Sequence, residues 1–399
     1  MNPWKGLNLL PRKMWIVFWV TLINRTGTMV LPFLALYLTK GKHVTESDAG
    51  LVIGVYGFAA LITAPFIGRL ADKIGALSVM KLSLVSSGIM FFIYSTIESY
   101  TGILIVTFFQ SVLNESFRPA SLSLVSEIVQ PKQRRTAFAL NRLAINLGMS
   151  IGPVAGGLLS EINFSLLFYV DGATALLAGF YLLFIKWDNQ SPEVINTDTS
   201  QPVDKDIHPG ILKDSKYIYF LLAIIPVEMV FFQHIGALPL FIVNGLGYSN
   251  SIFGLFSAIN TILIILIEVP LNNIMSGWSF RSALSLGAIL CGIGFGIPAF
   301  TEDLVLIIIS IIVWTFGEMI FFPGCAAYAA EISPIKKRGE YMGFFQMTFS
   351  FAFTAGPWLG TVALENFGPF WLWNGTLFLG ALTALLMLRI KEGEIKISS

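Results

Sequence analysis

Long apolar runs separated by short polar segments occupy most of this 399-residue chain. A helix needs about 20 apolar residues to cross a lipid bilayer, and the chain contains twelve runs of roughly that length. The pattern predicts an all-α membrane protein with twelve transmembrane helices. The predicted spans are residues 14–38, 49–70, 77–97, 101–129, 136–159, 164–185, 217–243, 251–275, 282–300, 304–332, 341–364 and 370–388.

The second half of the chain repeats the first at a fixed offset. Pro119 and Pro323 are 204 positions apart, and the same spacing relates further residues without a gap. These pairs are Gly50 with Gly254, Glu127 with Glu331, Arg134 with Arg338, Gly152-Pro153 with Gly356-Pro357, Gly156 with Gly360 and Glu161 with Glu365. Two parallel six-helix repeats are typical of transporters with a solute site between the halves. We therefore expect two pseudo-symmetric six-helix bundles, at residues 1–186 and 216–399.

The segment 187–215 between the halves is polar, acidic and proline-containing, so we expect a solvated linker. Most of the 25 lysines and arginines lie at the termini, in this linker and in alternate loops. Cytoplasmic loops retain basic residues, which predicts an inner-membrane protein with both termini and the linker in the cytoplasm. The first apolar run has the length of a span and no small-residue cleavage site after it, which predicts a retained helix.

Composition narrows the class of function. Hydrophobic residues make up 55% of the chain and charged residues 12%, with a mean hydropathy of +0.74, so lipid must cover most of the surface. A net charge of +1 without a basic patch argues against a nucleic-acid partner. Two cysteines in apolar runs and three scattered histidines suggest no metal site and no cofactor. No catalytic motif is present, so we predict a transporter rather than an enzyme.

Two motifs are similar to those of the major facilitator superfamily. The loop after the second span reads GRLADKIG at residues 68–75, which resembles the GxLaDrxG motif of that family. The fifth span contains GMSIGPVAGG at residues 148–157, which resembles its GPxxGG motif, associated in that family with antiporters. The charged end of the fourth span is also similar. The resemblance covers essentially the whole chain and implies a transporter that works by alternating access.

These motifs define two sets of candidate residues. In the first, a conformational latch, a carboxylate contacts the positive N-terminal end of a helix in the opposite half. The latch set is Gly68, Asp72, Lys73, Gly75, Glu127 and Arg134. A surface ion pair remains the alternative for Asp72. In the second set, small residues permit close helix contact and a proline opens the helix locally. This packing set is Gly148, Gly152, Pro153, Gly156 and Gly157.

Ionisable side chains inside spans are functional candidates, because each costs free energy to insert. Those near the middle of their spans are Arg25, Glu115, Arg118, Glu228 and Glu318. The resemblance implies that their helices, the first, fourth, seventh and tenth, line the central cavity. We therefore interpret the three glutamates as proton-coupling candidates, although Glu115 and Arg118, one helical turn apart, can instead pair with each other.

In the repeat, Asn24 occupies the position equivalent to Glu228, and Asn114 the position equivalent to Glu318. Both asparagines are therefore candidates too. The predicted substrate-binding set is Arg25, Arg118, Asn24, Asn114, Tyr37, His234 and Phe321. For the histidine and the aromatic residues, simple packing remains open.

The leading hypothesis is a proton-coupled exporter of amphipathic or cationic small molecules, resembling the drug:proton antiporters of the superfamily. The alternative is a proton-coupled importer of a polar solute such as a short peptide, with Arg25 and Arg118 binding a carboxylate and Glu318 an amine. A membrane receptor without transport is the third class. We expect a monomer whose partners are the small molecule, protons and the bilayer.

Overall fold

The computed structural model describes residues 7–130, 133–185, 187, 211–334 and 337–390. Ten helical segments in these ranges are long and apolar enough to cross a membrane. One of them, α14 (Arg338–Met387), is interrupted at Gly368, where φ is 81°, and it contains the eleventh and twelfth spans. The fourth span is divided between α5 (Tyr100–Glu115) and α6 (Phe117–Ile128). The prediction of twelve spans is therefore confirmed.

The remaining helices of the first half follow the predicted order. They are α1 (Arg12–Thr26), α2 (Val30–Leu36), the π-helical η2 (Tyr37–Gly41), α3 (Glu46–Ile74), α4 (Ala76–Thr96), α7 (Arg134–Ile162) and α8 (Ser165–Phe184), after the short η1 (Leu7–Leu9). The second half begins with η4 (Ile211–Lys213) and α9 (Ser215–Phe231), so α9 starts at the last residue of the predicted linker. Its other elements are η5 (Phe232–His234), α10 (Ala237–Leu240), η6 (Phe241–Gly245), α11 (Asn250–Ile274), η7 (Met275–Gly277), α12 (Phe280–Gly296), η8 (Ile297–Ala299) and α13 (Leu304–Ile332).

The first span is broken between α1 and α2. Gly27 occupies the break, and a Cβ there would lie 1.8 Å from the Thr174 side-chain oxygen of α8. The backbone N–H groups of Met29 and Val30, which the break leaves without helical acceptors, donate to the Asp171 carboxylate of α8 at 2.9–3.1 Å. The sixth span thus stabilises the broken first span.

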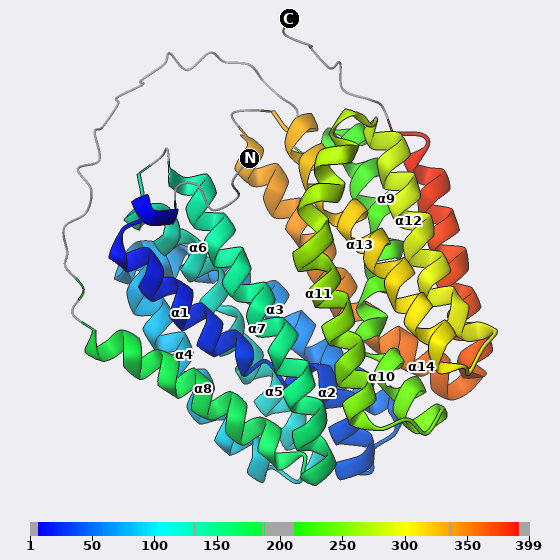
Figure 1. Cartoon of the computed structure of the whole chain (residues 1–399), viewed down its shortest axis with the longest axis horizontal. Coiled ribbons are helices and arrows are strands. Elements are labelled where there is room, and N and C mark those ends of the chain that lie inside the picture. The colour runs from blue at the N-terminus through cyan, green and yellow to red at the C-terminus, as the bar shows by residue number, and fades with distance from the viewer. Residues whose placement is uncertain (1–6, 131–132, 186, 188–210, 335–336, 391–399) are drawn as a thin grey trace, which may run out of the picture.

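The two halves form two bundles that touch at one end and diverge at the other, where α1 begins and α14 ends (Figure 1). We call the end where the bundles touch the outer end, and the end where they diverge the termini end. At the outer end one hydrophobic core is shared by both halves. In it the rings of Phe33 and Phe253 pack together, with their centroids 5.4 Å apart. At the termini end the first half has its own core, around α1, α4 and α6, and the second half another, around α9 and α13.

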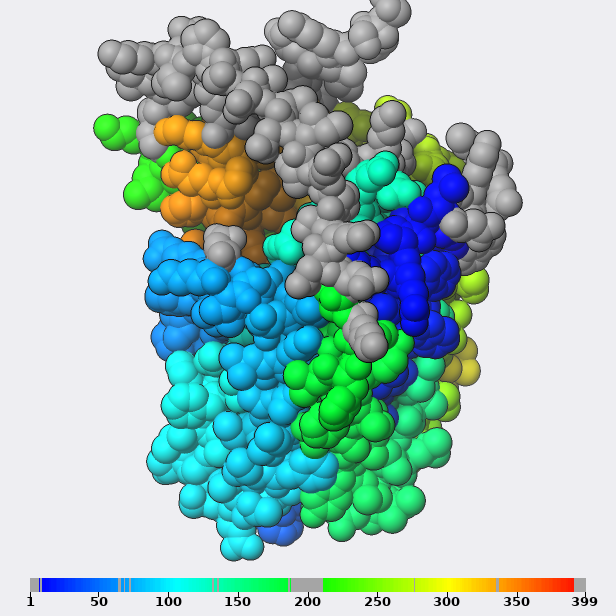
Figure 2. Space-filling model, turned by 90° about the vertical axis from the view of Figure 1, so that its left-hand side faces the viewer, coloured from blue at the N-terminus to red at the C-terminus, as the bar shows by residue number. Residues whose placement is uncertain are grey.

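Helices α4, α5 and α8 form much of the side of the first half that points away from the second half (Figure 2). Large apolar side chains on this face are exposed, among them Phe92 and Ile93 of α4 and Phe180 and Phe184 of α8. A water-soluble protein rarely gathers exposed large apolar side chains on one face. The distribution fits helices whose outer faces contact lipid.

Candidate functional site

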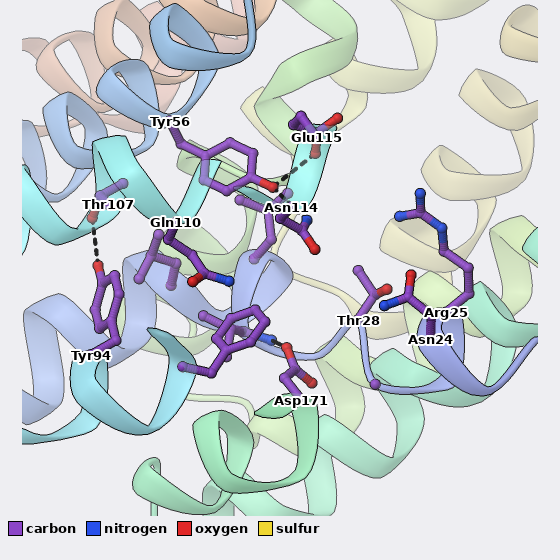
Figure 3. A pocket seen from close by; sticks show the side chains of 15 residues that line it. Asn24, Arg25, Thr28, Tyr56, Tyr94, Thr107, Gln110, Asn114, Glu115 and Asp171 are labelled. Carbon is purple, nitrogen blue, oxygen red and sulfur yellow. Dashed lines mark hydrogen bonds between the residues drawn. The ribbon is translucent and has the colours of Figure 1, made fainter. Parts of the chain in front are cut away.

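A pocket of about 60 Å³ lies within the first half, beside the break in the first span. This volume admits a few water molecules or a polar head group, whereas sites for whole drug-sized ligands are about 300 Å³ or more. Polar side chains enter it from five spans (Figure 3). They are Asn24, Arg25, Thr28, Tyr56, Tyr94, Thr107, Gln110, Asn114, Glu115 and Asp171. Four of the predicted site residues, Asn24, Arg25, Asn114 and Glu115, are thus brought together.

A hydrogen-bonded group forms one wall of the pocket. The Tyr56 hydroxyl donates to Glu115 Oε1 at 2.8 Å, and Asn114 Nδ2 donates to the same hydroxyl at 2.8 Å. The helix is interrupted after Glu115, at Ser116, and the Arg118 side chain is exposed. Glu115 therefore contacts a tyrosine on α3 rather than Arg118, and the simple i,i+3 pairing does not form.

Two pocket side chains have polar atoms that are buried and without a hydrogen-bond partner. These are both amide atoms of Gln110, which is 3% exposed, and Nε of Arg25. In Figure 3 the Gln110 amide points toward the centre of the pocket and Arg25 lies at its edge. Unpartnered buried polar groups cost free energy unless water or a ligand reaches them, so this pocket is suited to a polar ligand group.

Glu318 lies in the second half, away from this pocket. Its carboxylate accepts from Asn260 Nδ2 of α11 at 2.7 Å, and the same amide donates to Thr315 at 3.1 Å. The amide that contacts the carboxylate is neutral, so this hydrogen bond does not neutralise its charge.

Glu228 is 1% exposed and lies between α9 and α14, where one oxygen accepts from the Thr348 hydroxyl at 3.3 Å. Its other oxygen, Oε2, has no hydrogen-bond partner among the described residues. His234 lies in η5, at the break in the seventh span, and bonds the Phe231 carbonyl through Nδ1 at 2.6 Å. The three candidate glutamates thus occupy separate places rather than one cluster.

Tyr37 and Phe321 lie in packed interiors and do not line the pocket. The Tyr37 ring packs against Phe168, with centroids 4.8 Å apart. Phe321 is fully buried against α12, where a Cβ on Gly287 would lie 2.9 Å from its Cβ. In this conformation both residues pack within their own half.

The packing set divides between two neighbours. A Cβ on Gly148, Gly152 or Gly156 would meet the first span, at 2.4 Å from the Arg25 Cβ in the tightest case. Pro153 and Gly157 face the other half instead, and a Cβ on Gly254 of α11 would lie 2.4 Å from the Pro153 carbonyl oxygen. The motif therefore packs the fifth span against both the first and the eighth.

The latch set lies at the termini end. Gly68 and Asp72 lie on α3, and the side-chain surroundings of both positions lie outside the described part of the structure. Gly75 ends α3 with φ of 86°, a conformation that favours glycine. Lys73 and Arg134 are exposed, and Glu127 accepts from Ser123 one turn earlier.

Comparison of the sequence with models of known protein families identifies the family of the chain. The model of the Major Facilitator Superfamily matches residues 14–320 and 220–397. The chain belongs to the Major Facilitator Superfamily. It is a multi-pass membrane transporter and not an enzyme.

Relatives of this superfamily member include an MFS-type transporter, a cation/proton antiporter and a drug resistance protein. The MFS-type transporter YqjV of Bacillus subtilis is 24% identical over 92% of this chain and 89% of its own length. A Na(+), Li(+), K(+)/H(+) antiporter of Planococcus maritimus is 24% identical over 88% of each chain. The quinolone resistance protein NorA of Staphylococcus aureus is 27% identical over 38% of each chain.

Solved structures of two other transporters share the fold. A peptide transporter POT aligns with a TM-score of 0.77 at 15% identity, over 96% of both chains. The nucleoside transporter NupG aligns with a TM-score of 0.77 at 13% identity, over 95% of this chain and 99% of its own.

Several pocket residues of this superfamily transporter were not selected from the sequence. Gln110 carries a detectable signal, because an amide inside an apolar run is unusual. Tyr56 and Thr107 carry none, since such residues are frequent in spans. Asp171 is ionisable but lies nearer the end of its span than the residues selected, and only the structure brings it to the break in the first span.

Proposed function

We propose that this transporter is a proton-coupled exporter of amphipathic or cationic small molecules in the inner membrane, working as a monomer with both termini in the cytoplasm. In this orientation the diverging termini end faces the cytoplasm. The described conformation is then open toward the cytoplasm and closed at the outer end.

Glu318 is the observation that carries proton coupling. Its carboxylate lies in the middle of α13 and is hydrogen-bonded by the neutral Asn260. A charged group without a counter-ion is costly in the middle of a membrane, and a bound proton removes that cost. Antiport is supported by the cation/proton antiporter and the quinolone resistance protein among the relatives.

The pocket of the first half is the proposed place for the polar group of the substrate. Two carboxylates, of Glu115 and Asp171, and one guanidinium, of Arg25, line it. An excess of negative charge favours a cationic group, and the unpartnered Gln110 amide offers it an acceptor.

The test uses the purified full chain in proteoliposomes, with ethidium as a fluorescent amphipathic cation and an imposed pH gradient. We expect ethidium to move against the proton flux in the native protein. Glu318→Gln should abolish the dependence on the gradient, whereas Glu302→Gln, an exposed loop residue, should not. Ethidium flux that ignores the gradient in the native protein contradicts proton coupling.

The second candidate is a proton-coupled importer of a polar solute such as a short peptide. Arg25 beside two carboxylates in one pocket favours it, because such a set can hold both ends of a zwitterion. Dialanine is the probe in the same proteoliposomes. Movement of dialanine in the direction of the protons would support the importer and contradict the exporter.

A further inference from the structure

The pocket of the first half has a mouth toward the termini end and a floor toward the outer end. The fourth span runs from the shared core at the outer end to the core of the first half at the termini end, and both Gln110 and Glu115 lie on it. Glu115 is closer to the termini end and is partly exposed, whereas Gln110 is 3% exposed. Tyr94 and Thr107, which are also buried, join Gln110 at the floor. A group that enters from the diverging end therefore passes Glu115 before it reaches Gln110.

Gln110 is the buried pocket residue whose hydrogen-bonding capacity is unused. The hydroxyls of Tyr94 and Thr107 bond each other at 2.7 Å. Both carboxylate oxygens of Asp171 accept from backbone N–H groups at the start of α2. The Gln110 amide points toward the centre of the pocket (Figure 3), and neither its oxygen nor its nitrogen has a hydrogen-bond partner among the described residues. The floor therefore offers an entering group one acceptor and an NH2 donor.

The mouth carries the carboxylate that is available to a cation. Glu115 Oε1 accepts from the Tyr56 hydroxyl at 2.8 Å, and its Oε2 has no hydrogen-bond partner among the described residues. The formal charges of Glu115, Asp171 and Arg25, which all line the pocket, sum to −1. Hydrogen bonds from an ammonium to a carboxylate are among the strong ones in proteins. A cationic group is therefore best placed at the mouth, beside Glu115.

The size of the pocket limits what can enter it. A volume of about 60 Å³ holds roughly four water-sized groups at about 15 Å³ each. The rest of an amphipathic molecule must lie outside the mouth. There the Tyr56 ring packs against Phe353 of α14, with centroids 5.7 Å apart, and Phe353 stacks on Phe232 at 4.7 Å. An apolar body would meet these aromatic rings of the second half.

We propose that the pocket selects a head group in which an ammonium is followed, two carbon atoms further on, by a hydroxyl. The ammonium lies at the mouth against Glu115, and the hydroxyl lies on the floor against Gln110. A hydroxyl both donates and accepts, so it can pair with the oxygen and the nitrogen of the amide. An ammonium alone would use the amide oxygen and leave the N–H donors of Gln110 unpaired. Nitrogen, two carbons and oxygen are also as many groups as the volume admits.

The inference rests on the proposed function, because it concerns the site proposed for the polar group of the substrate. It narrows the substrate class from cationic amphipathic molecules to amines that carry a hydroxyl. Gln110 is then a specificity-determining residue that distinguishes one amine from another. Glu115 binds the charge that all of these amines share.

The test compares two amines that differ only at the floor of the pocket. N-benzylethanolamine and N-benzylpropylamine share the ring and the secondary ammonium, and the hydroxyl of the first is a methyl group in the second. Titration calorimetry of the purified full chain in lipid nanodiscs, at one pH and without a gradient, measures both Kd values. We expect the hydroxyl compound to bind about tenfold more tightly, as for one added hydrogen-bonded group. Equal affinities, or no binding of either amine, would overturn the proposal.

Variants separate the floor from the mouth. Gln110→Met, an unbranched apolar side chain of similar length, should bind the two amines with equal affinity. The variant should fold, because replacing an unpartnered buried polar group by an apolar one of similar shape costs little stability. Glu115→Gln should weaken the binding of both amines and keep their ratio. Gln346→Met, at an exposed position of α14, is the matched control and should change neither Kd.

Failure of this inference and failure of the proposed function give different results. A Gln110→Met chain that keeps the native ratio of the two Kd values would overturn the role of Gln110. A loss of affinity in that variant that is the same for both amines would overturn it as well, if the native ratio persists. Either result leaves proton-coupled ethidium flux intact. The proposed function fails separately, when proteoliposomes show no proton-coupled flux.

Discussion

Asp171 is the residue on which the conformation of the first span depends. Its carboxylate accepts three hydrogen bonds from the backbone of Met29 and Val30, at the start of α2. The side chain is 3% exposed, so water cannot replace it. A buried N–H group without an acceptor costs about 1–3 kcal/mol. One side chain of the sixth span therefore makes the break in the first span stable.

We expect Asp171→Ala to lower the free energy of unfolding by about 2 kcal/mol or more, because two N–H groups lose their acceptor. Asp303→Ala is the matched comparison. Asp303 accepts from Val305 and Leu306 at the exposed start of α13, where water can take its place, so the loss there should be about 1 kcal/mol or less. Tryptophan fluorescence during chemical unfolding in detergent measures the free energy of unfolding of both variants. Equal losses would contradict the role of burial.

Residue-scale reasoning from the sequence found part of the pocket. Asn24, Arg25, Asn114 and Glu115 were predictable because polar groups inside a span are costly and therefore informative. Tyr56, which bonds both Asn114 and Glu115, was not predictable. Its partners lie on another helix, and the sequence does not specify which helix faces which.

At the scale of the helices, the glycine-proline motif forms the same contact twice. A Cβ on Gly254 of α11 would lie 2.4 Å from the Pro153 carbonyl oxygen of α7, and a Cβ on Gly50 of α3 would lie 3.1 Å from that of Pro357 in α14. Both pairs obey the 204-residue repeat. Each contact brings a helix of one half against a helix of the other, so the motif has a role between the halves as well as within them.

Gly254→Ala should therefore push α11 away from α7 at the outer end, at a cost of about 1–3 kcal/mol, because the obstacle is backbone. We expect a lower thermal unfolding temperature and a longer distance between spin labels at Ile162 and Phe300, which are 77% and 68% exposed in opposite halves. Gly343→Ala is the control, since nothing lies within 4 Å of its Cβ position. An unchanged distance in Gly254→Ala would contradict close packing at this site.

At the scale of the whole molecule, two symmetric contacts hold the outer end closed. Glu161 at the end of α7 accepts from the backbone N–H of Ser251 at the start of α11, at 3.1 Å. Glu365 of α14 accepts from the backbone N–H of Ser47 at the start of α3, at 2.6 Å. A carboxylate at the N-terminal end of a helix is favourable by about 0.3–1 kcal/mol. The sequence predicts a contact of this kind for Asp72 at the termini end. The contacts made by Glu161 and Glu365 lie at the outer end.

Replacing both Glu161 and Glu365 by Gln should favour opening of the outer end by about 1–2 kcal/mol, since both charge–helix contacts are lost. The distance between labels at Ile162 and Phe300 should then show a larger long-distance population. Glu98→Gln and Glu302→Gln, exposed acids outside these contacts, serve as the control. A distribution identical to that of the native chain would show that the two contacts do not hold the halves together.

The sequence by itself determined the number of spans, the repeat and the family, because each depends on patterns that are local or that recur at a fixed offset. Hydrophobic length sets a span, and identical residues 204 positions apart set the symmetry. Only the tertiary structure decided which polar groups meet. It placed four of the five midspan charges in the pocket of the first half, in the surroundings of Glu318 and in the interior around Glu228, and it left Arg118 exposed. It also brought Arg142 to Glu268 across the halves, since contacts between helices depend on how the bundles rotate and pack, which no single span specifies.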